Sequence, residues 1–242
     1  MDFSLNGGVL IIGSLLWDTN EQRINWRNTC LKVNELIPIP SPIRYGRISK
    51  ERYCTFSMVF SNECNAPKLK GTGMFLPFIN NPINLEKIKT HSEELIKSEQ
   101  KKTTLKDDSN NWNWGTLTIC INPEILKKTS EKYEQAKSFL TYWSAKYANE
   151  FNPEHYKVGN ELPILNKQGV LQFDWTDELN DYDFIIATAT KPNVENYPTS
   201  KNIAERMIIN EYKEYFNENL NCGISTFQDK EIKKILEPNV NA

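Results

Sequence analysis

The hydrophobic positions of the chain begin with a short uninterrupted run. Residues 9–12 are apolar and branched, with Gly7 and Gly8 before them and Gly13 after them. A run of this length between glycines predicts a strand that is buried on both faces. Other segments rich in β-branched and aromatic residues predict further strands. These predicted strands cover residues 30–39, 53–60, 71–78, 114–121 and 184–190.

Helical spacing marks the segments between and after these strands. From Asn84 to Lys101, apolar residues recur at helical intervals among charged ones, and Asn84 has the side chain of a helix N-cap. Asn122 and Pro123 together predict the start of a long helix that runs to about Phe151. Shorter helices are predicted near residues 202–216 and 230–236, and residues 20–28 are expected to form a short helix or an irregular loop.

This order of elements predicts an α+β fold. Strands dominate the first half of the chain, one helix interrupts them, and helices dominate the second half. We expect a mixed or antiparallel sheet that closes into a barrel. The domain boundary is expected near Asn122, with a barrel core over residues 1–121 and a helical extension over residues 122–242. We expect the extension to contribute at least one strand and to pack on the same core.

Composition and charge narrow the classes of function. Of the 242 residues, 39% are hydrophobic and 25% are charged, as is typical of a globular protein. The formal net charge is -2. Since nucleic-acid-binding proteins generally carry a basic excess, we expect no nucleic-acid partner.

The same sequence features predict the compartment. The apolar N-terminal segment 7–17 is too short to span a bilayer, and Asp18 follows it directly, so we expect no membrane partner and no signal peptide. The five cysteines are odd in number and form no Cys-x-x-Cys pair, which indicates free thiols rather than a disulfide framework or a zinc site. Together these features predict a cytoplasmic protein.

Common catalytic and cofactor motifs are missing from the sequence. The chain has only two histidines, His91 and His155, so a Ser-His-Asp or Cys-His site is not expected. No His or Cys cluster has the spacing of metal ligands, and neither a phosphate-binding P-loop nor a dinucleotide-binding glycine loop occurs. We therefore expect no metal and no cofactor, and a small-molecule substrate or ligand.

The loop after the first strand is the most informative segment. It reads Gly13, Ser14, Leu15, Leu16. Successive backbone N–H groups in such a turn can form a concave anion site, and glycine allows a ligand to approach the main chain closely. The loop is thus a candidate cradle for a carboxylate or a developing oxyanion. The alternative is a tight turn without a ligand.

This loop resembles the Tyr-Gly-Ser-Asn/Leu-Leu signature of the gamma-glutamylcyclotransferase-like superfamily. That family also carries a glutamate in a helix after a hydrophobic strand, and here Glu99 stands in the helix that follows the strand at 71–78. Order and spacing match over residues 8–121, about half of the chain. The sequence departs from the family where Ile12 replaces the usual tyrosine, Leu15-Leu16 replaces the commoner Asn-Leu, and Gln100 replaces the glycine after the glutamate.

The resemblance implies a small mixed β-barrel in which Glu99 faces the loop. It also implies cyclotransferase chemistry, in which the loop holds the substrate carboxylate and the glutamate is the acid/base that forms 5-oxoproline. Glu93 and Glu94 are the fallback positions for this role. Two alternatives stay open, namely that Glu99 lies on a solvated helix face, and that the protein is a non-catalytic small-anion binding module on the same fold.

Two further segments carry candidate chemistry. Residues 42–52 hold three arginines, which suit phosphate or carboxylate, and Arg47 beside Gly46 is the expected helper of the loop. The alternative is a solvated hairpin whose charges pair with local acids such as Glu51.

Hydroxyl residues at 188–190 could line a pocket, or could serve only packing. The sequence leaves a homo-oligomer, or a partner for the C-terminal helices, open.

Overall fold

The main structural feature is a six-stranded mixed sheet. The computed structural model describes residues 4–101, 111–127, 130–145 and 151–237. The strand order in the sheet is β2-β5-β1-β8-β7-β6, and every neighbouring pair is antiparallel except β1 with β8. These strands are β1 (Gly7–Ile11), β2 (Ile37–Ser41), β5 (Gly71–Pro77), β6 (Asn111–Trp112), β7 (Gly115–Ile121) and β8 (Phe184–Thr190).

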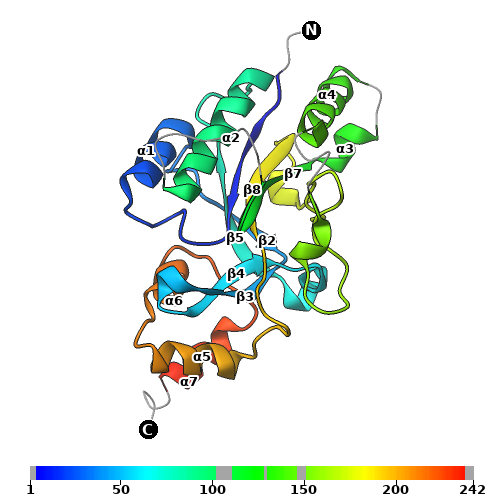
Figure 1. The fold of residues 1–242 in the computed structure, drawn as a ribbon. Coiled ribbons are helices and arrows are strands. Elements are labelled where there is room, and N and C mark those ends of the chain that lie inside the picture. Colours follow the sequence, from blue (N-terminus) through cyan, green and yellow to red (C-terminus); the bar gives the residue numbers. More distant parts are fainter. Residues whose placement is uncertain (1–3, 102–110, 128–129, 146–150, 238–242) are drawn as a thin grey trace.

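A second, two-stranded sheet lies below the first in Figure 1. It consists of β3 (Ile43–Ser49) and β4 (Thr55–Phe60), which pair antiparallel. The last helices of the chain pack on this hairpin, and the C-terminus lies at the opposite end of the molecule from the N-terminus (Figure 1). The hairpin therefore joins the large sheet to the C-terminal helices.

Seven helices in the described part of the chain flank the two sheets (Figure 1). The first two pack against each other beside β1 and β5 (Figure 1). The helices are α1 (Glu21–Cys30), α2 (Leu85–Gln100), α3 (Pro123–Leu126), α4 (Glu131–Ala145), α5 (Ser200–Ile209), α6 (Glu214–Asn221) and α7 (Asp229–Leu236). Short 3-10 helices stand at Lys50–Arg52, Asn62–Asn65, Pro67–Leu69, Pro153–Tyr156 and Asp177–Leu179.

The predicted α+β class with a mixed sheet is confirmed, but the expected barrel is wrong. In the described part of the chain the sheet stays open, with β2 and β6 at its two edges. Pro38 and Pro40 lie in β2, and a proline has no N–H with which to bond a further strand. At the other edge β6 has only two residues. Neither edge is therefore suited to closing the sheet.

Most predicted elements are confirmed with small shifts, and three differ. The predicted strand at 30–39 is replaced by the end of α1 and by β2, which starts at Ile37. The long helix expected from Asn122 is interrupted after Leu126, and a new helical segment starts near Ser130, whose hydroxyl accepts from the N–H of Tyr133. The helix expected at 202–216 is two helices, because Glu211 has a positive φ of 51° between them.

The second half of the chain is part of the main sheet. Strand β8 lies between β1 and β7, so that Val9 faces Ile186 and Ile119 also faces Ile186 in the ladder. Apolar residues from both halves form one buried cluster. The boundary expected at residues 121/122 stays a prediction, but the strand from the extension lies at the centre of the core.

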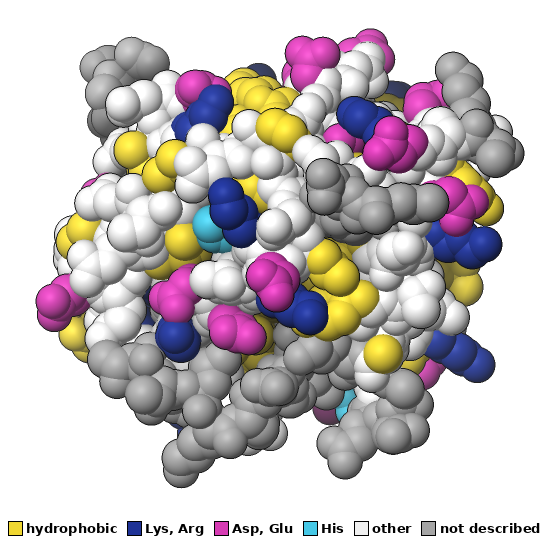
Figure 2. Space-filling model, turned by 90° about the horizontal axis from the view of Figure 1, so that it is seen from above, with side chains coloured by type: hydrophobic (Ala, Val, Ile, Leu, Met, Phe, Trp, Pro, Cys, Tyr) yellow, Lys and Arg dark blue, Asp and Glu magenta, His cyan; other side chains and the backbone are white. Residues whose placement is uncertain are grey.

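On the face seen in Figure 2, acidic and basic side chains are interspersed, with no large area of one sign. Among the described residues, no helix combines the length and hydrophobicity needed to cross a membrane. All five cysteines are free thiols.

Candidate functional site

A cavity of about 760 Å³ lies where the main sheet meets the β3–β4 hairpin. The end of β1 and its following loop, the last turn of α2 and the end of β8 form its walls. The hairpin, the segment 112–114 and Tyr215 of α6 complete the lining. Segments far apart in the sequence thus meet at one cavity.

The cavity brings together five of the six residues that the sequence singled out. Gly13, Ser14, Leu15, Arg47 and Glu99 all line it. The lining thus includes the loop, the helix glutamate and the arginine that were expected to act together.

The sixth predicted residue, Leu16, does not line the cavity. Its N–H donates to the carbonyl of Gly13 at 3.2 Å, which closes the turn. Within the described residues, the N–H groups of Ser14 and Leu15 donate to no other group. The available cradle is therefore limited to the residues before Leu16.

The turn is held from two sides. Arg27 of α1 donates to the carbonyl of Leu15 at 2.6 Å and to the carbonyl of Asp18 at 3.0 Å. The indole N–H of Trp17 donates to the amide oxygen of Asn219 in α6 at 2.9 Å. Because both backbone and side chain are anchored, the loop is a preorganised part of the cavity wall.

Gly13 leaves room for the side chain of Tyr215 as well as for a ligand. A Cβ atom at Gly13 would lie 2.8 Å from the hydroxyl of Tyr215. That hydroxyl also accepts from the N–H of Met58 at 3.2 Å. Glycine is thus required at this position because α6 brings Tyr215 against the loop.

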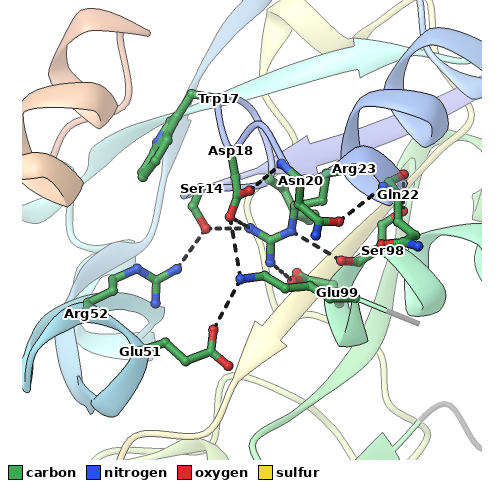
Figure 3. A network of polar contacts seen from close by, with 12 residues as sticks. Ser14, Trp17, Asp18, Asn20, Gln22, Arg23, Glu51, Arg52, Ser98 and Glu99 are labelled. Carbon is green, nitrogen blue, oxygen red and sulfur yellow. Dashed lines mark hydrogen bonds and ion pairs between the residues drawn. The ribbon is translucent and has the colours of Figure 1, made fainter. Parts of the chain in front are cut away.

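Ser14 is the centre of a polar network (Figure 3). Its buried hydroxyl accepts from Arg23 at 2.9 Å and from Arg52 at 2.7 Å. Arg23 is itself buried and also donates to Asp18 at 2.8 Å and to Glu99 at 3.3 Å. One guanidinium therefore links the loop, α1 and the end of α2.

Glu99 lies inside the cavity and not on a solvated face. Its side chain is 9% exposed. Burial raises the pKa of this carboxyl above its ordinary value, while the charge of Arg23, the hydroxyl of Thr188 and the charge of Arg52 partly oppose that rise. The Thr188 hydroxyl lies beside the carboxylate without forming a well-aligned hydrogen bond. A carboxyl with a raised pKa is suited to proton transfer near neutral pH.

The other glutamates of α2 are placed differently. Glu93 is exposed, and Glu94 pairs with Lys97 at 2.7 Å. Neither lines the cavity. After Glu99 the helix ends at Lys101, which is left-handed with a φ of 51°. Gln100 is still helical, so the glycine expected after the glutamate is not required there.

Arg47 reaches the cavity because of a bulge at Gly46. Tyr45 pairs with Met58 but Arg47 pairs with Ser57, so the register shifts between them. A one-residue shift moves a side chain to the opposite face of a strand. Without the bulge Arg47 would share the face of Tyr45, which is fully buried. Its guanidinium donates to the carbonyl of Lys191 at 2.8 Å.

Sequence reasoning missed Arg23 and did not single out Arg52. Arg23 stands in a polar stretch in which no pattern distinguishes a buried arginine from an exposed one. Arg52 belongs to the arginine-rich segment, but its contact with Ser14 depends on the folded hairpin. Thr188 does line the cavity, as one interpretation of the hydroxyl-rich segment predicted.

Across the part of the chain that the structure describes, no group of three His, Cys, Asp or Glu side chains could hold a metal ion. Comparisons of the chain with protein-family models, with curated proteins and with solved structures found no match in any of the three.

Proposed function

We propose that this protein is a gamma-glutamylcyclotransferase-like enzyme that acts on a small amine- or amide-containing substrate. One observation carries the proposal, namely that Glu99 and the loop Gly13–Ser14–Leu15 line one cavity. We also propose that the chain has the fold of that family in a divergent, open form, and that Arg47 helps to bind the substrate.

The proposed reaction is an internal amide exchange. Glu99 accepts a proton from the α-amine of a γ-glutamyl amide, and the amine nitrogen attacks the γ-carbonyl carbon. The C–N bond to the leaving amine then breaks as Glu99 returns the proton to that nitrogen. The products are 5-oxoproline and a free amine. A raised pKa supports both proton transfers by one carboxyl.

Backbone and side-chain groups of the wall support substrate binding. The N–H groups of Ser14 and Leu15 are available for the substrate carboxylate or for the oxyanion. The hydroxyl of Ser14 accepts from two guanidiniums, which adds positive charge next to these N–H groups. An anionic group is therefore favoured at the loop.

A second candidate is a non-catalytic small-anion binding module. Its support is the ion pair between Glu99 and Arg23. A general base needs a carboxylate that is available to accept a proton, whereas this carboxylate is already paired. The two candidates differ in turnover and share the ligand site.

The test is release of 5-oxoproline from a panel of γ-glutamyl amines. Glu99→Gln should lower kcat/KM by at least about a hundredfold, in the range typical of general acid–base catalysis. Glu94→Gln is the matched control, because it makes the same change on the same helix outside the cavity. Full activity of folded Glu99→Gln would remove Glu99 from the mechanism, and binding without turnover by the wild type would favour the binding module.

We further propose a cytoplasmic location and a small-molecule ligand, with no nucleic-acid partner. The five free thiols fit a reducing compartment. The interspersed charges of the face in Figure 2 fit a protein that does not bind a polyanion there.

A further inference from the structure

Two arginines in the cavity wall lack a carboxylate partner. Arg47 and Arg52 both line the cavity and are half-buried. Among the described residues, neither forms an ion pair with Asp or Glu. The sequence left open that the charges of this hairpin pair with local acids. Within the described part of the chain, Arg47 and Arg52 do not form such pairs.

The acids nearest to them are engaged elsewhere. Glu51 lies 3.5 Å from Lys101, and Glu99 lies 3.3 Å from Arg23. Asp18 is paired with Arg23 at 2.8 Å. The local carboxylates thus pair with Arg23 and Lys101 and, in the part of the chain that is described, form no ion pair with Arg47 or Arg52, although the charge of Arg52 still acts on Glu99.

Both guanidiniums are held in place by groups that leave their charge intact. Arg47 donates to the carbonyl of Lys191. Arg52 donates to the hydroxyls of Ser14 and Ser49 and stacks 4.3 Å from the ring centre of Tyr215. Each guanidinium has further N–H donors in a rigid fork. These donors are preorganised for an acceptor in the cavity.

The positive charges in this part of the wall act on one another. Burial, and after it the charge of Arg52, lowers the pKa of Arg47, while burial, and after it the charge of Arg47, lowers the pKa of Lys191. Such repulsion between fixed cations is relieved when an anion binds between them. A carboxylate carries one negative charge, whereas a phosphoryl group carries nearly two at neutral pH and has three acceptor oxygens.

We propose that Arg47 and Arg52 together bind a phosphoryl group, so that the ligand of this cavity is a phosphorylated small molecule. The inference deepens the proposed function, because the phosphoryl group would lie on the amine or amide whose other end meets Ser14 and Glu99. The anion site itself does not depend on turnover. Binding of inorganic phosphate can therefore test it separately.

The experiment is calorimetric titration of the full chain with inorganic phosphate and, in parallel, with acetate. We expect phosphate to bind at least about tenfold more tightly than acetate, since charge-assisted bonds to two guanidiniums favour the dianion. Arg47→Gln should weaken phosphate binding at least about tenfold, and Arg47→Lys should fall between that variant and the wild type. Arg206→Gln, which removes one arginine outside this cavity, should bind phosphate within about twofold of the wild type.

The outcomes separate this inference from the proposed function. Phosphate that binds no better than acetate, or Arg47→Gln that binds as well as Arg206→Gln, would overturn the phosphoryl site. Should Arg47→Gln fail to fold, Arg47→Lys decides, since it keeps the charge and loses the fork. If phosphate binding depends on Arg47 but the protein releases no 5-oxoproline, the phosphoryl site is supported and the proposed enzyme activity is refuted. If the protein releases 5-oxoproline but does not bind phosphate, the enzyme activity is supported and the phosphoryl site is refuted.

Discussion

The guanidinium of Arg23 lies 3.3 Å from the carboxylate of Glu99, and both side chains are buried. Two opposing effects therefore act on this carboxyl. Burial raises its pKa and the adjacent charge of Arg23 lowers it, with a net rise. Since Arg23 also donates to Ser14, the same cation positions the loop and tunes the proposed acid/base (Figure 3).

Removing the charge of Arg23 should raise the pKa of Glu99 further. Arg23 is the largest of the effects that oppose burial, so Arg23→Gln should move the Glu99 titration to higher pH. Carbon-13 NMR of the Glu99 carboxyl, assigned by its loss in Glu99→Gln, measures this shift. In an active protein the acid limb of kcat/KM should move to higher pH in parallel, because Glu99 must be charged to accept a proton.

Arg23→Lys keeps the charge and is the control for that experiment. It should shift the Glu99 pKa less than Arg23→Gln does. A fall in the pKa of Glu99, or equal shifts in both variants, would contradict the assigned role of Arg23.

Ser14→Ala should destabilise the protein. The substitution removes the shared acceptor of the buried Arg23 guanidinium and the half-buried Arg52 guanidinium, so we expect the free energy of unfolding to fall by about 1–3 kcal/mol. Ser57→Ala is the comparison, because the hydroxyl of Ser57 makes one bond, to the carbonyl of Arg47 at 3.3 Å. Urea unfolding of both variants should rank Ser14→Ala as the more costly change, and the opposite ranking would mean that the network does not stabilise the loop.

Local patterns were enough to predict several of the strands that form the core. The segments at 184–190 and 71–78 have high strand propensity, and both are buried strands of the sheet. For these strands the signal lies within one short segment. That Glu99 faces the loop was implied only by the family resemblance, and both line one cavity.

The features that depend on packing between distant segments were not predictable in this way. Arg23 is buried because α1 packs on α2, and its sequence neighbours give no sign of that. The bulge that turns Arg47 into the cavity is visible only in the pairing of β3 with β4. The open sheet likewise depends on which strands become edges, which the order of elements along the chain does not determine.

Gly13→Ala should destabilise the protein through a contact with Tyr215. The added Cβ would lie 2.8 Å from the Tyr215 hydroxyl, but the next atom of that ring is 3.7 Å away. Removing the hydroxyl with Tyr215→Phe should therefore relieve most of the clash. A double-mutant cycle by urea unfolding should show a favourable coupling of about 1 kcal/mol or more between the two changes. Additive costs would mean that the glycine is needed for another reason.

Asp229 should make stability depend on pH below neutrality. Burial raises the pKa of this carboxyl to about 6 from its ordinary value of 3.8, although hydrogen bonds from the side chain and backbone of Thr226 oppose the rise. Between pH 3.8, the pKa in the unfolded state, and about pH 6, the pKa in the folded state, the folded protein binds more protons than the unfolded protein. The stabilising contribution of protonated Asp229 is thus complete below pH 3.8 and is lost as pH rises through about 6.

The difference between wild type and Asp229→Asn isolates this effect from the other titrating groups. From pH 4 to pH 7 the free energy of unfolding of the wild type should fall relative to that of Asp229→Asn by up to about 3 kcal/mol. Urea unfolding at several pH values measures it, and Asp181→Asn, at an exposed carboxylate, should follow the wild-type curve. A relative rise of wild-type stability over that range would mean that Asp229 is held charged in the folded protein, with the Thr226 bonds stronger than the cost of burial.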